Sequence, residues 1–141
     1  LPETNLEDGY FEEGTFYTSE EDFKKIVKNN TGIVLSEKQL IKGFFSNTLT
    51  DDLRKTLPKV GIVHIDVDLY SSTIEVLNFI KPLLVQGSLL IFDDWYCFPG
   101  GSEAGERKAF TEFCSNNPNF EYEEWKNYST FGKSIFVKEI P

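Results

Sequence analysis

Several residue types are scarce in this chain, and each shortage excludes a class of protein. The 141 residues contain two cysteines, Cys97 and Cys114, outside any CxxC or CxxH motif. They are too few for a disulfide framework and lack the spacing of a zinc site, so we expect free thiols in a reducing compartment, the cytoplasm. No apolar run approaches the roughly 20 residues of a membrane span, and the first residues lack the pattern of a signal peptide.

Positive charge is scarce as well. Lys and Arg number 14 against 23 Asp and Glu, which gives a formal net charge of -9. Nucleic acids and anionic membranes both attract clustered basic side chains, so we expect neither as a partner. An acidic surface suits metal ions and neutral small molecules better. The sequence is also compatible with a homo-oligomer.

Methionine is absent altogether, and the chain begins with Leu1-Pro2-Glu3. We therefore expect a processed or truncated chain. What remains is enough for one folded domain over residues 1–141, because apolar residues make up 40% of the sequence and can fill a core.

The hydrophobic pattern predicts alternating strands and helices. Helices are expected at residues 20–30, capped by Ser19 and closed by Gly32, and near 51–57, capped at position 47 or 48. Further helices are expected from 71 or 72 to about 84, with a break at the proline in position 82, and at 102–115. Strands are expected at residues 39–45, 60–66 and 88–93, followed by an antiparallel pair at 120–125 and 132–138. This order indicates a doubly wound α/β domain.

Acidic residues stand where two of the apolar strands end. Asp66 and Asp68 follow the first strand, and Asp93 and Asp94 follow the next one along the chain. Such strands are usually neighbours, and open α/β sheets bind ligands at the carboxyl ends of their strands, so we expect the four carboxylates to converge. Grouped acids repel one another unless a cation is present, and hard oxygen ligands suit Mg²⁺, Mn²⁺ or Ca²⁺. The alternative for any single acid is that it only caps the following helix.

Two further features near these acids have a functional and a structural interpretation. His64 lies two residues before Asp66 and faces the site if the strand alternates regularly, although a lone His in an apolar strand is more often a hydrogen-bonded core residue. The aromatic loop at residues 95–98 can stack on a flat ligand or simply pack over the edge of the sheet.

Taken together, the motifs permit a family comparison. They are HIDVDLYSST at 64–73, the strand with its Asp pair at 87–94, Pro-Gly at 99–100 with the helix that follows, KGFFSNTL at 42–49, and LPE at 1–3. In this combination they resemble the macrocin O-methyltransferase (TylF-type) family, whose members are class I, S-adenosylmethionine-dependent enzymes that methylate sugar hydroxyls. The resemblance spans nearly the whole chain.

The resemblance implies a set of roles. The metal ligands of the family fall on Asp66, Asp93 and Asp94, a proposed general base falls on Asp68, and Phe45 and Ser46 match positions that lie against the adenine in related enzymes. The implied cofactors are S-adenosylmethionine and Mg²⁺. The implied partner is a small-molecule hydroxyl acceptor, a sugar or glycoside.

One part of the family pattern is missing from the sequence. The Gly-rich turn after the first strand of the family and the acid after its second strand would both precede Leu1. We therefore expect an incomplete Rossmann-like methyltransferase fold, the C-terminal portion of a class I domain, which lacks its first two strands and ends in an antiparallel pair. Such a chain holds the metal and acceptor half of the site and does not bind S-adenosylmethionine in the usual way of the family.

Two other functions remain open from the sequence. The first is a non-catalytic or truncated methyltransferase-like fragment that keeps the half-sheet and turns nothing over. The second is a phosphatase of the haloacid dehalogenase type, because an Asp-x-Asp motif and a later Asp pair also occur there. That family differs at the position of Tyr70 and places a long cap between its motifs.

Overall fold

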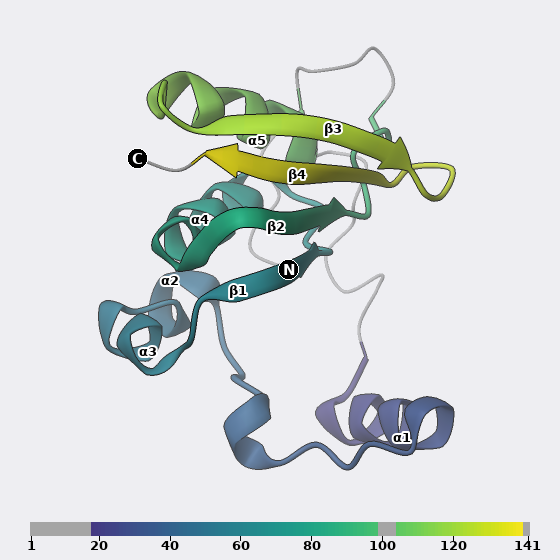
Figure 1. The fold of residues 1–141 in the computed structure, drawn as a ribbon. Coiled ribbons are helices and arrows are strands. Elements are labelled where there is room, and N and C mark those ends of the chain that lie inside the picture. The colour runs from purple at the N-terminus through teal and green to yellow at the C-terminus, as the bar shows by residue number, and fades with distance from the viewer. Residues whose placement is uncertain (1–17, 99–103, 140–141) are drawn as a thin grey trace.

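A four-stranded sheet stands at the centre of the structure, a computed structural model that describes residues 18–98 and 104–139 (Figure 1). Its strands are β1 (Val60–Ile65), β2 (Leu84–Phe92), β3 (Glu121–Asn127) and β4 (Lys133–Glu139). The helices are α1 (Glu20–Thr31), α2 (Phe45–Thr48), α3 (Asp51–Thr56), α4 (Tyr70–Ile80) and α5 (Gly105–Asn116), with short 3₁₀ turns η2 (Glu37–Gln39) and η3 (Lys81–Leu83).

The strands lie side by side in the order β1-β2-β4-β3. β1 and β2 are parallel, and β4 runs antiparallel to both β2 and β3. In the register of the parallel pair, Ile65 lies opposite Phe92, so both strands end at the same edge of the sheet. The predicted α/β class and the closing antiparallel pair are confirmed, and the sheet is that of an incomplete Rossmann-like fold.

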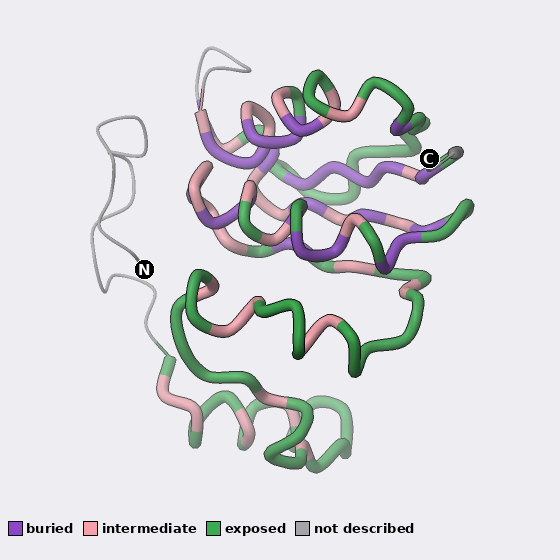
Figure 2. Tube along the Cα trace, turned by 90° about the vertical axis from the view of Figure 1, so that its left-hand side faces the viewer, coloured by how far each residue is buried: buried purple, intermediate pink, exposed green. Residues whose placement is uncertain are grey.

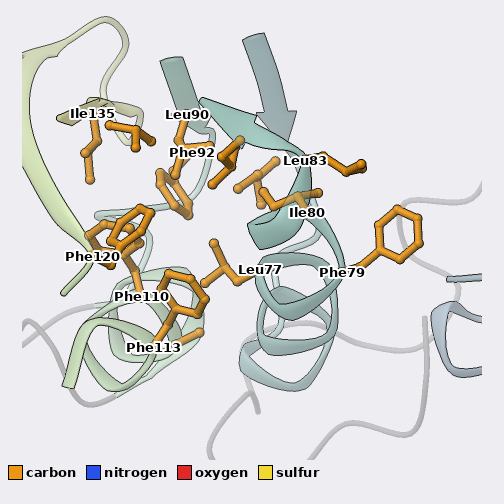
Figure 3. Packing of buried hydrophobic residues seen from close by; sticks show 14 of the residues in the cluster. Leu77, Phe79, Ile80, Leu83, Leu90, Phe92, Phe110, Phe113, Phe120 and Ile135 are labelled. Atoms are coloured by element: carbon orange, nitrogen blue, oxygen red, sulfur yellow. The ribbon is translucent and has the colours of Figure 1, made fainter. Parts of the chain in front are cut away.

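Helices α4 and α5 pack against each other and against one face of the sheet. Alternate residues of β2 and β4, such as Leu90, Phe92 and Ile135, point toward these helices and are fully buried. They meet Leu77 of α4 and Phe110 of α5 (Figure 3). This apolar layer fixes the sheet against the two helices and thereby fixes the edge at which β1 and β2 end.

The opposite face of the sheet is more open. Ile62 of β1 is 67% exposed, and Trp125 of β3, whose ring contacts Phe136, is 51% exposed. Exposure is also high along residues 18–59, which Figure 2 shows as mostly green tube, whereas the buried segments gather in the sheet, α4 and α5. None of the helices in residues 18–98 and 104–139 has the length and apolar character needed to cross a membrane.

Most helices begin or end at or near the residues that their local sequence predicts. Ser19 caps α1 by accepting the N–H of Asp22, and Gly32 closes the helix in the left-handed conformation, as expected. α4 ends at Ile80, just before the predicted break. The predicted cap of the third helix at position 47 or 48 is wrong, because Thr50 takes that place and accepts the N–H of Leu53.

The predicted strand at residues 39–45 is also wrong. The segment contains the end of η2, an irregular stretch and the start of α2. Ser36 donates its N–H to the side chain of Gln39 at 3.0 Å, which stabilises the turn locally. Gly43 has a positive φ of 145°, which interrupts an extended run. Apolar side chains alone do not make a strand where no neighbouring strand pairs with it.

Candidate functional site

The first acids of the site lie on the turn between β1 and α4. β1 ends at Ile65, one residue before its predicted end, so both Asp66 and Asp68 belong to the turn. Asp68 has φ 57°, a left-handed conformation that non-glycine residues rarely adopt. The N–H of Leu69 donates to the carbonyl oxygen of Val67 across this tight turn. The turn leaves Asp66 exposed and Asp68 half-buried at the edge of the sheet.

Asp94, which follows the end of β2, lies close to these two residues. The N–H of Asp93 donates to the carbonyl oxygen of Ile65 at 3.0 Å, which extends the pairing of the two strands to their last residues. One carboxylate oxygen each from Asp66, Asp68 and Asp94 lies within 4.8 Å of the others. Asp68 and Asp94 also share a side-chain hydrogen bond. We call these three residues the acidic cluster.

Asp93 is engaged next to the acidic cluster. Its Oδ1 accepts a hydrogen bond from the hydroxyl of Tyr128 at 2.6 Å and lies 4.0 Å from Nε2 of His64. Tyr128 belongs to the connection between β3 and β4, so the C-terminal hairpin contributes to the site. The structure therefore groups Asp66 and Asp94 with Asp68, whereas the resemblance implied a ligand set of Asp66, Asp93 and Asp94. The metal role of each acid stays a prediction.

Burial and mutual repulsion dominate the electrostatics of the acidic cluster. Burial raises the pKa of Asp68 to about 7, with further contributions from its hydrogen bond to Asp94 and from the nearby negative charges. Burial and the charge of Asp93 raise the pKa of Asp66, while His64 opposes the rise. Asp68 is therefore poised between its charged and neutral forms near neutral pH.

Glu106 lies in the first turn of α5 and was missed by the sequence reasoning. Its side chain is fully buried, and its Oε2 accepts the N–H of Asp94 at 3.0 Å. Burial raises its pKa to about 9, although hydrogen bonds from the backbone of Asp94 and Val67 oppose the rise. A signal existed, because residue 106 shares a helical stripe with Ala109, Phe110 and other core residues. A buried acid on such a stripe marks an exceptional position.

Glycine at position 105 allows α5 to begin close to the acidic cluster. It has φ 58°, and a Cβ atom there would lie 2.3 Å from the ring of Phe98 and 3.3 Å from the carbonyl oxygen of Asp68. Trp95 and Phe98 are each only 7% exposed, so the described part of the aromatic loop packs over the edge of the sheet. Cys97 and Cys114 are free thiols, and burial raises the pKa of Cys97 to about 11.

Phe45 and Ser46, the residues matched to adenine contacts, begin α2. Phe45 is half-buried and Ser46 is exposed. α2 and α3 precede β1 and lie toward its start, whereas the acidic cluster follows its end (Figure 1). His64 has a side chain that is 53% exposed, so it is not the buried core residue of the structural interpretation.

The donor atoms at the sheet edge fit a divalent cation. Three carboxylates supply hard oxygens in close proximity, and Asp66 keeps the group accessible from solvent. Burial raises the pKa values of Asp66 and Asp68, and the neighbouring negative charges, which a cation would offset, add to the rise. Within residues 18–98 and 104–139, Oε1 of the buried Glu106 has no hydrogen-bond partner and is therefore a further unsatisfied acceptor near these acids.

A known protein family matches most of the chain. The model of the macrocin O-methyltransferase (TylF) family matches residues 16–116. The chain belongs to this family. The match contains both acidic motifs and the KGFFSNTL segment, so the resemblance noted in the sequence is confirmed. Among curated proteins no match was found.

Solved methyltransferase structures share the fold of this TylF-family chain. The O-methyltransferase NovP is 22% identical, with a TM-score of 0.68 over 86% of this chain and 46% of NovP. CalS11, a calicheamicin methyltransferase, is 22% identical, with a TM-score of 0.52 over 69% of this chain and 36% of CalS11. A second structure of CalS11, described as a TDP-rhamnose 3'-O-methyltransferase, has a TM-score of 0.51. The chain thus spans less than half the length of these proteins.

Proposed function

We propose that this chain forms the metal and acceptor half of an S-adenosylmethionine-dependent O-methyltransferase that acts on a hydroxyl of a sugar or glycoside. The observation that carries the proposal is the acidic cluster at the shared end of β1 and β2, in a chain of the TylF family. The sugar or glycoside acceptor is supported by the names of the family and of CalS11, the latter described as a TDP-rhamnose 3'-O-methyltransferase. Cytoplasmic location and a homo-oligomer stay predictions.

In this proposal Asp66 and Asp94 hold a divalent cation, Mg²⁺ by preference for hard oxygen ligands. Asp93, the third ligand that the family resemblance implies, would complete the set, and its Oδ1 accepts the hydrogen bond from Tyr128. When bound, the cation lowers the pKa of an acceptor hydroxyl beside it, and S-adenosylmethionine supplies the methyl group.

Asp68 accepts the proton of the acceptor hydroxyl. General bases work best when their pKa lies near the operating pH, and the surroundings of Asp68 raise its pKa to about 7. The left-handed turn holds this carboxylate beside Asp94, so the proton acceptor and the cation ligands remain adjacent.

The cofactor side of the reaction is assigned to the rest of the fold. Phe45 and Ser46 are the residues of this chain proposed to contact S-adenosylmethionine, but they begin α2 and are not grouped with the acidic cluster. Since the chain spans 46% of NovP, we expect residues 1–141 alone not to bind S-adenosylmethionine with micromolar affinity. Titration calorimetry checks this, and micromolar binding would contradict the half-site proposal.

Transfer of a labelled methyl group from S-adenosylmethionine to glycosides with neighbouring hydroxyls tests the proposed function, in a protein that combines residues 1–141 with the cofactor half of the methyltransferase fold. Activity should require Mg²⁺ and disappear with EDTA. Asp94→Asn should abolish the response to Mg²⁺, and Asp68→Asn should lower kcat by about 10²- to 10⁴-fold with little change in unfolding. Asp52→Asn is the matched control, because Asp52 is an exposed acid of α3 paired with Lys55.

The alternatives give different results in the same assay. A non-catalytic fragment transfers no methyl group in any condition and retains at most cation binding. A phosphatase releases phosphate from a generic phosphomonoester, which membership of the TylF family makes the less favoured outcome. EDTA-resistant transfer by the Asp94→Asn protein would remove the metal role.

A further inference from the structure

Glu106 occupies a position where an acid is costly. It lies on the stripe of α5 that faces the core, next to Ala109 and Phe110, and none of its side-chain surface is exposed. Its Oε1 has no hydrogen-bond partner among residues 18–98 and 104–139. A leucine of similar size would avoid the desolvation cost of a carboxyl group there. The presence of an acid therefore needs a reason other than packing.

The other oxygen of Glu106 supplies that reason. Oε2 accepts the N–H of Asp94 at 3.0 Å, and the backbone of Val67 lies close enough to lower the pKa of this side chain. Val67 lies between Asp66 and Asp68, on the turn after β1. A single side chain from α5 therefore connects the turns that follow two different strands, at the residues that carry the acidic cluster.

We propose that Glu106 is a positioning residue that holds the two turns of the acidic cluster in register by accepting their backbone hydrogen bonds. The meaning of the cluster as a cation site rests on the proposed function, whereas the connection rests on the hydrogen bond from Asp94 to Glu106 and on the approach of α5 to the turn at Asp68. Gly105 supports the role, because the absence of a Cβ lets the first turn of α5 approach the carbonyl oxygen of Asp68.

Two substitutions separate positioning from packing. Glu106→Gln keeps an acceptor oxygen at the same distance from the backbone, whereas Glu106→Leu keeps the volume and removes the acceptor. Glu112→Gln and Glu112→Leu are the matched controls, because Glu112 lies on the same helix, accepts a hydrogen bond from the hydroxyl of Tyr70 and is not a member of the acidic cluster. If Glu106→Leu does not fold, Glu106→Asp, which withdraws the carboxylate by one methylene, replaces it.

The first measurement is the affinity for Mn²⁺, determined by electron paramagnetic resonance. Changes to a residue that orients metal ligands by hydrogen bonds typically weaken metal binding by about 10- to 100-fold. We expect a loss of this size in Glu106→Leu or Glu106→Asp, near-normal affinity in Glu106→Gln, and no change in the Glu112 controls. Normal affinity in a folded Glu106→Leu protein would overturn the proposal. Equal losses in the Gln and Leu proteins would also overturn it, because they would show that the charge matters and not the acceptor.

The second measurement is amide hydrogen exchange at Val67 and Asp94 without metal. Exchange should accelerate at these two amides in Glu106→Leu and remain near normal in Glu106→Gln, while the Leu90 amide in the middle of β2 changes little. Uniform acceleration would indicate a merely structural role. This readout needs neither cation nor methyl transfer, so it tests the connection even if the unaltered protein transfers no methyl group and the proposed function fails.

Discussion

Residues 18–59 and residues 60–139 are built from similar local signals but differ in what their helices contact. α1, α2 and α3 bury no residue, whereas α4 and α5 bury Leu77, Phe110 and others against the sheet. α1 has a good cap and an acidic first turn, yet Phe23 and Ile26 on its apolar side are about half exposed. The comparison shows that capping and periodicity form a helix, while only a partner surface buries it.

The two regions also differ in what holds them together. In residues 18–59 the side-chain interactions are surface ion pairs, such as Lys25 with Asp22 and Lys55 with Asp52, and local hydrogen bonds at the ends of helices and turns. Such pairs contribute about 0–1 kcal/mol each. In residues 60–139 the apolar layer under the sheet is buried and supports the acidic cluster. The candidate site therefore belongs to the region with the larger core.

A substitution in the core should show the largest difference in unfolding free energy between the two regions. Leu77→Ala removes a fully buried side chain of α4 and should cost about 2–5 kcal/mol of unfolding free energy. Phe23→Ala in α1 should cost less than about 1 kcal/mol, because this ring is 44% exposed. Urea unfolding of both variants measures the difference. Equal costs would mean that α1 is packed in solution.

Stability should depend on pH with opposite sign in the two regions. The folded pKa of Asp68 is raised to about 7 and that of Glu106 to about 9, so both groups favour the protonated folded state. Without cations, this contribution is present at low pH and is lost as the pH rises from about 4.5 to about 9. The pKa of Glu20 and of Asp22 is lowered by hydrogen bonds, so their contribution is lost as the pH falls through these lowered values.

Hydrogen exchange resolved by region measures this pH dependence in metal-free buffer. Protection in β1, β2 and α5 should weaken with rising pH, and protection in α1 should weaken only in acid. The same trend in both regions would show that the buried acids do not control the pH response.

A divalent cation should stabilise only the region with the acidic cluster. At 100 times its dissociation constant, Mn²⁺ should add about 2.7 kcal/mol to the unfolding free energy. Protection should rise around Asp66 and Asp94 and remain unchanged in α1, and the effect should vanish in Asp66→Asn. Calorimetric melting with Mn²⁺ or EDTA provides the check. An undiminished shift in Asp66→Asn would place the cation elsewhere.

Removal of the Tyr128 hydroxyl should have a smaller effect, confined to the end of β2. Tyr128→Phe loses the hydrogen bond to Asp93 and should cost about 1 kcal/mol. Tyr96→Phe is the control, because its hydroxyl bonds the exposed Asn127 at 3.2 Å. Urea unfolding measures the cost, and the NMR shift of the Asp93 carboxyl carbon should respond only to Tyr128→Phe. An unchanged shift would contradict the contact.

The smallest effect is expected from the ion pairs of α1. Lys25→Ala removes a pair with Asp22 in which both side chains are more than half exposed, and the unfolding free energy should change by less than about 0.5 kcal/mol. The helix content at high salt should match that of the unaltered chain, because salt already screens the pair. A loss above 1 kcal/mol would show that surface charge matters more in this region than burial does.

The sequence was most informative where the pattern was local. Ser19 and Gly32 predicted both ends of α1, and the apolar runs before Asp66 and Asp93 predicted the two parallel strands. It failed at residues 39–45, because an apolar run becomes a strand only when another strand supplies hydrogen bonds. It also predicted a strand to residue 66, whereas β1 ends at Ile65.

The sequence by itself determined the chemistry available to this protein: four acids that follow two strands, in an order specific enough to indicate the TylF family. Only the tertiary structure decided which of them meet. The left-handed turn at Asp68 brings that residue to Asp66 and Asp94, the hairpin brings Tyr128 to Asp93, and α5 places Glu106 beneath both turns. The physical reason is that these contacts join residues distant in the chain, through packing that no local pattern encodes.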